Sequence, residues 1–431
     1  MDTTPKGNRL HIGIFGRTNV GKSSLMNFLV GQDIAITSPV AGTTTDIVEK
    51  AVELLPLGPV LFLDTAGLDD TSALSSLRLE KTQKAYDRAD VILLVTEPEI
   101  WTDYEETILT EAGKRKIPTL IVINKIDLQN PSDGFIQRLK GRSERVISLS
   151  SEDWKERDRS VESLKRHLIE VSPDDYIRTP SLIGDLLPPG GLAVLVVPID
   201  LQAPKGRLIL PQVQTIRDAL DCDAAVFIVK ERELSPALAT LNHAPDIVVC
   251  DSQAILKVSA DVPNNVPCTT FSILFARQKG DIVSAAAGVT RIEELIPADK
   301  ILIVEACSHH PLQDDIGRVK IPRWLRQYVG AEIQVDVSAG RDYPDNLNDY
   351  KLIIHCGACM LTRREMLNRI QRAKEAQVPI TNYGIAISFL QGVVRRTLSP
   401  FPSALYAYEK RMEAIKRAKG SGEMIHENTG K

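Results

Sequence analysis

The sequence has few of the features that mark secreted, membrane-spanning or nucleic-acid-binding proteins. No apolar run reaches the roughly 18 residues that a membrane-spanning helix needs. The formal net charge is -4 and the basic residues are not clustered, so we expect neither nucleic acid nor an anionic membrane as the main partner. Residues 1–10 are polar and lack the apolar stretch of a signal peptide, which points to the cytoplasm.

Cysteine is also scarce, with six in 431 residues. So few cysteines do not make a disulfide framework, and in a reducing compartment Cys-x-x-Cys pairs more often bind metal or act in redox chemistry. Cys222, Cys250 and Cys268 have no partner at that spacing, and we interpret them as buried structural thiols. Segment 204–207, Pro-Lys-Gly-Arg, could grip a phosphate, but a lone basic turn is more often a solvated loop.

A complete phosphate-binding loop stands near the start of the chain. A strand pattern at residues 11–15 runs into Gly-Arg-Thr-Asn-Val-Gly-Lys-Ser-Ser at residues 16–24, and a helix pattern follows. Glycines let backbone N–H groups wrap the phosphates, the lysine adds a charge beside the β- and γ-phosphates, and the serine hydroxyl binds Mg²⁺. The predicted nucleotide-binding residues of this loop are Gly16, Gly21, Lys22, Ser23 and Ser24.

Two further motifs belong to the chemistry at the γ-phosphate. A strand at residues 60–63 ends in Asp64, a carboxylate near Mg²⁺, and then Gly67, which can sense hydrolysis. Between the loop and this strand, Thr44 can reach Mg²⁺ only while the γ-phosphate is present. We therefore expect Lys22, Thr44, Asp64 and Gly67 to act in catalysis, and Ser23, Thr44 and Asp64 to hold Mg²⁺.

The base-recognition residues indicate that the nucleotide is GTP. A strand at residues 119–123 delivers Asn124, Lys125 and Asp127, and this aspartate can accept both N–H groups of guanine and reject adenine. A strand at residues 146–149 leads to Ser150 and Ser151, where the base is usually buttressed.

The order of these motifs resembles the small GTPases of the TrmE, Era and EngA type over about residues 8–172. The resemblance implies that Asn19 coordinates a potassium ion. Leu68 stands where Ras-like proteins place a water-orienting glutamine, and the resembled family also lacks that glutamine. We therefore predict slow GTP hydrolysis that potassium stimulates.

Beyond the predicted nucleotide domain, strand and helix patterns alternate, which is typical of parallel sheets. Apolar runs at residues 192–199, 224–229 and 246–250 are separated by helical patterns at 210–220 and 236–242. This piece, roughly 80 residues long, is small for a stable monomeric domain, so we expect it to share a sheet edge or helix face with a second copy as a homodimer.

Three cysteines lie at the carboxyl ends of predicted strands farther on. Cys307 follows a strand at residues 300–305, while Cys356 and Cys359 follow a strand at 352–355. In an open parallel sheet ligands bind at this edge, so the two segments can converge. Thiolates favour zinc or an iron-sulfur cluster. Three cysteines and a histidine would close a zinc site, whereas three cysteines with an exchangeable ligand would hold a 4Fe-4S cluster. A structural zinc site usually stabilises a small domain that has too little hydrophobic core. This region has apolar strands of its own, so we favour the cluster.

The whole chain resembles the HydF family, the maturation GTPases of iron-only (FeFe) hydrogenases. The resemblance lies in Cys-Ser-His at residues 307–309, His-Cys-Gly-Ala-Cys at 355–359, and the runs 203–208 and 314–323. It implies a dimeric scaffold that carries a 4Fe-4S cluster and a di-iron subcluster precursor, which radical-SAM maturases build and this protein transfers to apo-hydrogenase. It also implies the cluster ligands Cys307, Cys356 and Cys359, with His309 and His355 as further candidates. The fourth ligand is left open between His309, His355, His310, Asp314 and an outside group.

The expected architecture is therefore α/β in three domains. Residues 1–172 form a P-loop GTPase domain, 173–190 a linker, 191–268 a dimerisation domain, 269–400 an iron-sulfur cluster-binding domain and 401–431 a charged tail. The alternative is a zinc-stabilised GTPase that assists ribosome or tRNA processing. The acidic balance and the lack of an RNA-binding motif count against it.

Overall fold

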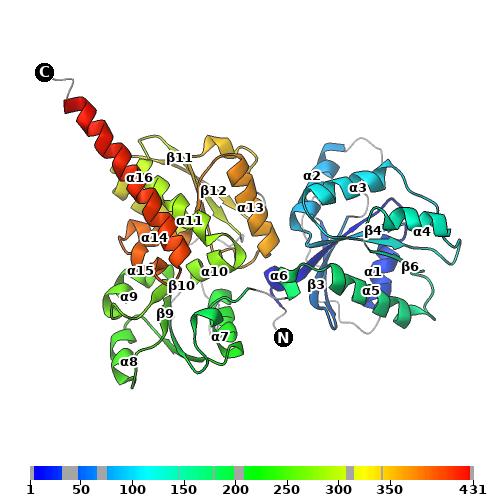
Figure 1. The fold of residues 1–431 in the computed structure, drawn as a ribbon, viewed down its shortest axis with the longest axis horizontal. Helices are drawn as coiled ribbons and strands as arrows, with labels where there is room; N and C mark the ends of the chain where they lie inside the picture. The colour runs from blue at the N-terminus through cyan, green and yellow to red at the C-terminus, as the bar shows by residue number, and fades with distance from the viewer. Residues whose placement is uncertain are drawn as a thin grey trace. The chain divides into compact units, whose positions relative to one another are not determined.

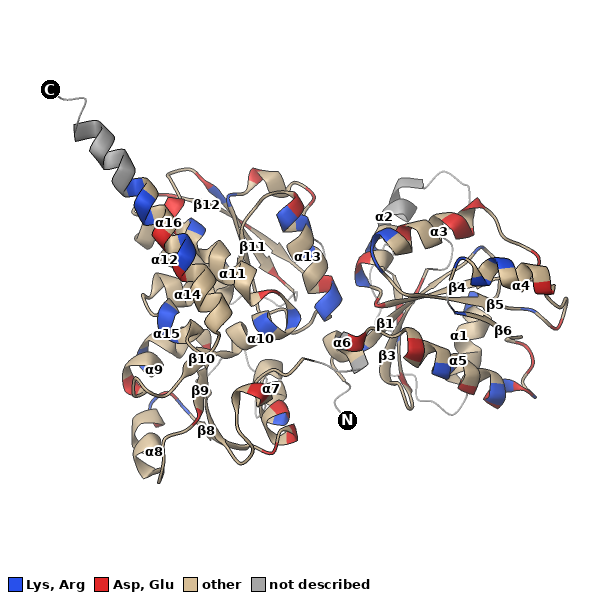
Figure 2. Ribbon diagram, viewed as in Figure 1, with Lys and Arg blue, Asp and Glu red and all other residues tan. Residues whose placement is uncertain are grey.

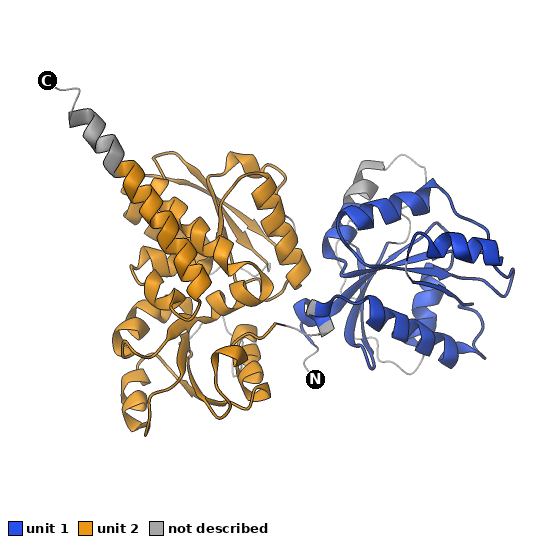
Figure 3. Cartoon of the chain, in the orientation of Figure 1, with its two compact units in different colours: residues 1–179 blue, residues 180–431 orange. Residues whose placement is uncertain are grey.

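The computed structural model describes residues 4–31, 47–65, 75–143, 145–177, 180–198, 208–306, 315–340 and 343–427. The chain divides into two compact units, Met1–Thr179 and Pro180–Lys431 (Figure 3). In both units helices cover sheets whose strands are mostly parallel (Figure 1). The predicted α/β class is confirmed.

The first unit contains a six-stranded sheet in the order β2-β3-β1-β4-β5-β6, in which only the β2–β3 pair is antiparallel. Its strands are β1 (Leu10–Phe15), β2 (Val48–Leu54), β3 (Gly58–Asp64), β4 (Val91–Thr96), β5 (Thr119–Ile123) and β6 (Val146–Ser148). Its helices are α1 (Lys22–Val30), α2 (Ser75–Arg88), α3 (Asp103–Lys114), α4 (Asp133–Lys140), α5 (Arg157–Val171) and α6 (Asp174–Ile177). β1 lies between β3 and β4, so the chain continues to one side of β1 and later crosses to its other side. In open α/β sheets ligands bind beside such a reversal of strand order, which is where the loop after β1 lies.

The second unit contains two four-stranded parallel sheets, in the orders β10-β9-β7-β8 and β12-β11-β13-β14. The first sheet consists of β7 (Leu192–Val196), β8 (Ala225–Val229), β9 (Ile247–Cys250) and β10 (Cys268–Thr270). The second consists of β11 (Lys300–Glu305), β12 (Gln334–Ala339), β13 (Leu352–His355) and β14 (Ile380–Asn382). The helices are α7 (Leu210–Asp221), α8 (Leu234–Thr240), α9 (Ile255–Asp261), α10 (Phe271–Lys279), α11 (Ile282–Val289), α12 (Ile321–Val329), α13 (Arg363–Glu375), α14 (Tyr383–Leu390), α15 (Val394–Leu398) and α16 (Pro402–Glu427).

One hydrophobic core joins the two sheets of this unit. It contains Leu195 of β7, Phe275 of α10, Ile303 of β11 and Ile387 of α14, all fully buried. The expected boundary after residue 268 falls within β10, the edge strand of the first sheet. Because α10 follows β10 directly and packs against α14, no linker separates the two sheets.

Most of the predicted charged C-terminal segment forms one long helix. Helix α16 packs against α11 (Figure 1). Its Ala404, Tyr408 and Ile415 are buried. These apolar residues form a stripe among the charged ones, which is the pattern of a helix that packs on a core.

Charges of both signs are interspersed along the surface helices (Figure 2). Within the described part of the chain, no helix is long and apolar enough to cross a membrane.

Candidate functional site

The phosphate loop connects β1 to α1, and two of its residues have to be glycine. Gly16 has φ 151° and Gly21 has φ 90°, a backbone region that side chains rarely adopt. A Cβ atom at Gly16 would lie 2.4 Å from the carbonyl oxygen of Val95, and one at Gly21 would lie 2.3 Å from Nδ2 of Asn124. The loop can therefore pack closely against β4 and the base motif only with glycine at these positions.

Lys22 is buried at the start of α1, where its ammonium group donates to two carbonyl oxygens of the loop. Its Nζ lies 2.6 Å from the oxygen of Gly16 and 2.8 Å from that of Arg17. Ser23, the next residue, is exposed in the first turn of α1. Asp64, at the carboxyl end of β3, pairs with Ile14 of β1 in the sheet register. The structure thus gathers Lys22, Ser23 and Asp64 at one sheet edge, while Thr44 and Gly67 lie outside the described residues.

Asn124 joins three of the predicted motifs. Its Nδ2 donates to the oxygen of Val20 at 2.9 Å and to Oγ of Ser151 at 3.1 Å, and its Oδ1 accepts from the N–H of Ser151 at 3.0 Å. Ser150 is buried beside Ser151. Asp127 is exposed in the same loop as Asn124, where its carboxylate is open to a ligand.

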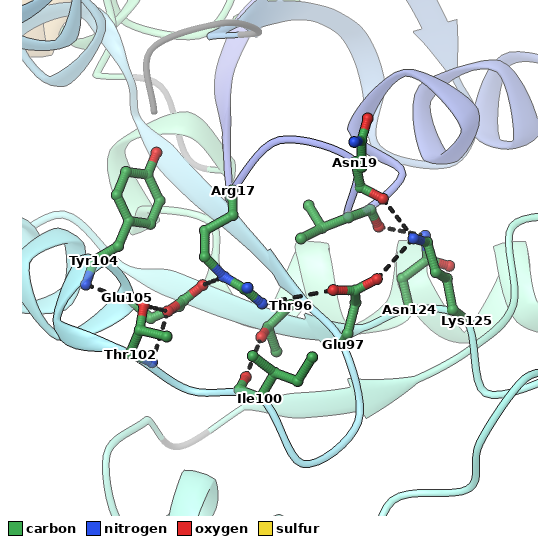
Figure 4. A network of polar contacts seen from close by, with 12 residues as sticks. Arg17, Asn19, Thr96, Glu97, Ile100, Thr102, Tyr104, Glu105, Asn124 and Lys125 are labelled. Carbon is green, nitrogen blue, oxygen red and sulfur yellow. Dashed lines mark hydrogen bonds and ion pairs between the residues drawn. The ribbon is translucent and has the colours of Figure 1, made fainter. Parts of the chain in front are cut away.

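Lys125 links the base motif to the phosphate loop, because its Nζ donates to the carbonyl oxygen of Asn19. Three charged residues outside the predicted set continue this network, namely Arg17, Glu97 and Glu105 (Figure 4). Thr-Asp-Tyr-Glu at residues 102–105 could have been identified in the sequence as a helix capping box. No sequence signal pairs Glu105 with Arg17.

Cys356 lies at the carboxyl edge of the last sheet, beside the end of β11. β11 pairs with β12 on one side and with β13 on the other, so strand order reverses beside β11. Cys356 follows β13, and its Sγ accepts the backbone N–H of Ala306 at 3.1 Å. Ala306 directly precedes Cys307 in the chain. Cys307, His309, His310 and Asp314 themselves lie outside the described residues.

The surroundings of Cys356 have opposing effects on its thiol. Burial is the largest effect and, with the charge of Glu305, raises the pKa of Cys356 above its ordinary value, although the N–H groups of Ala358 and Ala306 and the charge of Arg369 lower it in part. The thiol is therefore protonated without a metal, and a bound metal would displace the proton and use these donors to stabilise the thiolate. Cys359 is partly buried in the turn that follows. The two thiols and the backbone donors at Cys356 therefore fit a thiolate-bound metal centre.

In the described arrangement, hydrogen bonds to other groups occupy the nitrogens with which His355 could bind a metal. Its Nδ1 donates to the carbonyl oxygen of Cys356 at 2.9 Å, and its Nε2 accepts from Nη1 of Arg369 at 2.9 Å. Burial and the Arg369 charge lower the pKa of His355 to about 3, so the ring is neutral. Both ring nitrogens are engaged, and His355 would have to give up one of these hydrogen bonds to bind a metal.

Among the residues that the structure describes, no three His, Cys, Asp or Glu side chains are grouped so that they could hold a metal ion. Cys356 lines a mostly apolar cavity together with Phe275, Ile380 and Thr381.

Three family models match the chain. Residues 182–280 match the hydrogen maturase F dimerization domain, and residues 283–400 match the hydrogen maturase F tetramerization domain. Residues 11–125 match the model described as 50S ribosome-binding GTPase. The chain belongs to the hydrogen maturase F family. Its first unit carries a GTPase domain that supports binding of GTP and Mg²⁺, its domains indicate a GTPase of hydrogenase maturation, and two of them indicate homo-oligomerisation.

Curated GTPases match part of the chain. The tRNA modification GTPase MnmE of Bordetella parapertussis is 42% identical over 120 residues, which are 28% of this chain and 26% of that protein. The GTPase Der of Wolinella succinogenes is 38% identical over 125 residues, again 28% of this chain and 26% of that protein. The chain thus spans about a quarter of the length of these relatives.

Solved structures of GTPases are also similar. Era of Aquifex aeolicus, bound to GDP and AlF4⁻, is 19% identical with a TM-score of 0.31, covering 54% of this chain and 98% of that one. The G domain of the T. maritima FeoB iron transporter is 20% identical with a TM-score of 0.29, covering 38% of this chain and 98% of that one.

Proposed function

We propose that this chain hydrolyses GTP in its first unit and carries a 4Fe-4S cluster and a di-iron subcluster precursor in its second. In this proposal it receives the precursor from radical-SAM maturases and delivers it to the apo form of an iron-only hydrogenase. The observation that supports the proposal best is the presence, in one chain, of a GTPase domain and both hydrogen maturase F domains, with Cys356 at the ligand-binding edge of the last sheet.

In the nucleotide unit, the proposed roles follow from position. Lys22 sits inside the phosphate loop and would exchange its carbonyl contacts for the β- and γ-phosphates. Ser23 and Asp64 would hold Mg²⁺, and Asp127 would accept the guanine N–H groups. Thr44 and Gly67 remain proposed catalytic residues. Because Leu68 replaces a water-orienting side chain, we propose that hydrolysis is slow and that Asn19 holds a potassium ion near the phosphates.

In the second unit, Cys307, Cys356 and Cys359 are the proposed cluster ligands. The Ala306 N–H that reaches Cys356 Sγ supports the proposal, because it brings the chain beside Cys307 to the other cysteine segment. When bound, such a cluster supplies an iron with a replaceable ligand, to which a bridging group of the precursor can attach. His309, His310, His355 and Asp314 are the candidates for that replaceable position.

We further propose that strand β8 joins a second copy of the chain. It is an edge strand, and Phe227 and Ile228 on it are 36% and 42% exposed. An exposed apolar edge is a template for pairing with another sheet. In sedimentation experiments Ile228→Lys should halve the number of chains in the assembly, whereas Leu128→Lys, at an exposed apolar residue of the GTPase unit, should leave that number unchanged. An assembly of wild-type size in Ile228→Lys contradicts this placement.

Activation of an apo-hydrogenase tests the proposed function. Wild-type chain that has been incubated anaerobically with the two radical-SAM maturases and their substrates should, after repurification, restore hydrogen evolution to apo-hydrogenase. Cys356→Ala should restore none, while Cys222→Ala should match wild type. If the wild-type chain restores no activity, or if it contains zinc after anaerobic purification, the carrier function is wrong.

A further inference from the structure

Glu97 stands between the two loops that bind the two ends of a nucleotide (Figure 4). It follows β4, and its Oε1 accepts a hydrogen bond from Lys125 Nζ at 2.7 Å. Its Oε2 lies 3.6 Å from Nη2 of Arg17, an ion pair slightly too long for a hydrogen bond. A single carboxylate thus contacts a cation of the phosphate loop and a cation of the base motif.

A second carboxylate fixes the phosphate-loop end of this network. Glu105 is fully buried, and its Oε1 accepts from Arg17 Nε at 2.7 Å. Its Oε2 accepts from both the N–H and the hydroxyl of Thr102, at 2.9 and 2.6 Å, which closes the capping box of α3. Because Glu105 is held on both sides, Arg17 has a fixed position from which it can orient Glu97.

The base-motif end depends on contacts for its backbone conformation. Lys125 has φ 61°, and Asn19, whose carbonyl oxygen accepts from Lys125 Nζ, has φ 67°. Asparagine tolerates this left-handed region, but for lysine it has a cost that surrounding contacts must compensate. Glu97 supplies such a contact, because it holds the ammonium group that also reaches Asn19.

We propose that Glu97 is a positioning residue of the guanine-nucleotide site, which holds the phosphate loop and the base motif at the separation that a bound nucleotide requires. The inference rests on the proposed function, since it presupposes that GTP and GDP bind here. A preorganised site binds its ligand more tightly because less ordering remains to be done on binding. Since Glu97 contacts neither Lys22 nor Asp64 among the described contacts, its loss should weaken GDP and GTP binding alike and leave the chemical step unchanged.

Glu97→Gln tests this role, with Glu99→Gln as the matched control. Glu99 lies in the same loop but is exposed and accepts from the N–H of Ser132 at the start of α4. We expect Glu97→Gln to raise the Kd of both GDP and GTP about fivefold, as for loss of a partly exposed charged contact, with KM rising in parallel and kcat within about twofold of wild type. Glu99→Gln should leave all three unchanged. In a Lys125→Met background, Glu97→Gln should add no further loss, because its effect passes through Lys125.

The outcomes separate this inference from the function on which it rests. A wild-type chain that binds no guanine nucleotide contradicts the proposed function. If the wild type binds and Glu97→Gln binds equally well, or if Glu97→Gln lowers kcat without changing Kd, the positioning role is overturned and the GTPase stands. An equal loss in Glu99→Gln, or a full additional loss on top of Lys125→Met, also overturns it. Should Glu97→Gln fold poorly, Glu97→Asp, which keeps the charge on a shorter side chain, should give an intermediate Kd.

Discussion

The nucleotide site and the cysteine site both lie at the carboxyl edge of a parallel sheet, yet they are held together differently. In the nucleotide site, protein groups already bridge the motifs: Asn124 contacts Val20 and Ser151, and Lys125 contacts Asn19. At Cys356, by contrast, a backbone N–H of the neighbouring chain segment, that of Ala306, reaches the thiol itself. Side-chain bridges thus hold the described nucleotide motifs together, while in the second unit the contact falls on the sulfur atom that we propose as a cluster ligand, and metal binding would add further bonds there.

Lys22→Ala should abolish most GTP turnover in the nucleotide site and leave cluster binding at the cysteine site unchanged. Removing the ammonium group deprives the β- and γ-phosphates of their charge partner, so we expect GTP turnover to fall about 100-fold or more. The content of iron and sulfide after reconstitution should equal that of wild type. Phosphate release and iron analysis on the same preparation measure both quantities, and parallel losses would show that the two sites are not independent.

Arg369→Met should show how much the Arg369–His355 contact beside Cys356 contributes to the stability of the second unit. Arg369 is buried and donates to Nε2 of His355, so its removal leaves that nitrogen without this donor. We expect the free energy of unfolding of the second unit to fall by about 2 kcal/mol in urea titrations.

Arg372→Met provides the control for this change. Arg372 lies on the same helix, α13, and donates to the oxygen of Pro344, but its side chain is 32% exposed. Its loss should cost less than about 1 kcal/mol. Equal losses in the two variants would mean that the Arg369–His355 contact contributes nothing specific to this part of the fold.

Potassium should speed GTP hydrolysis in the nucleotide site, since it would add a positive charge near the phosphates. We expect GTP turnover to be about tenfold faster in potassium than in sodium buffer. Asn19→Gly should abolish the difference, because it removes the exposed side chain while glycine accepts the φ of 67° without strain. Equal turnover of the wild type in both buffers would remove potassium from the account.

The two sites also differ in how far the sequence predicts them. Each nucleotide motif is contiguous and carries its own backbone requirement, so Gly16, Gly21, Lys22 and Asn124 could be assigned from spacing, and the structure brings them together. The ion pairs of Glu97 with Arg17 and Lys125 could not be predicted in this way, because an ion pair between distant loops produces no periodic or local pattern in the sequence. For the cysteines, strand patterns predict that residues 307 and 356 share a sheet edge, but not that β11 and β13 are neighbours.

The same limit applies to the divisions of the second unit. Alternating patterns correctly indicate two sets of parallel strands, but the shared core depends on α10 and α14, whose packing partners lie far along the sequence. The sequence pattern also indicates a charged helix near the end of the chain, but not that Ala404, Tyr408 and Ile415 pack α16 against α11, because the partner helix lies more than 100 residues earlier.

The measurement that tests the central claim most directly is EPR spectroscopy of the reduced protein after anaerobic reconstitution with iron and sulfide. The wild-type chain should give the signal of a 4Fe-4S cluster with about four irons per chain, and added imidazole should change it at the replaceable ligand. Cys222→Ala should keep the signal, and Cys356→Ala should lose it while still hydrolysing GTP. An absent signal in the wild type, or one that Cys356→Ala leaves unchanged, would contradict the claim that this GTPase carries a cluster at that edge of its last sheet.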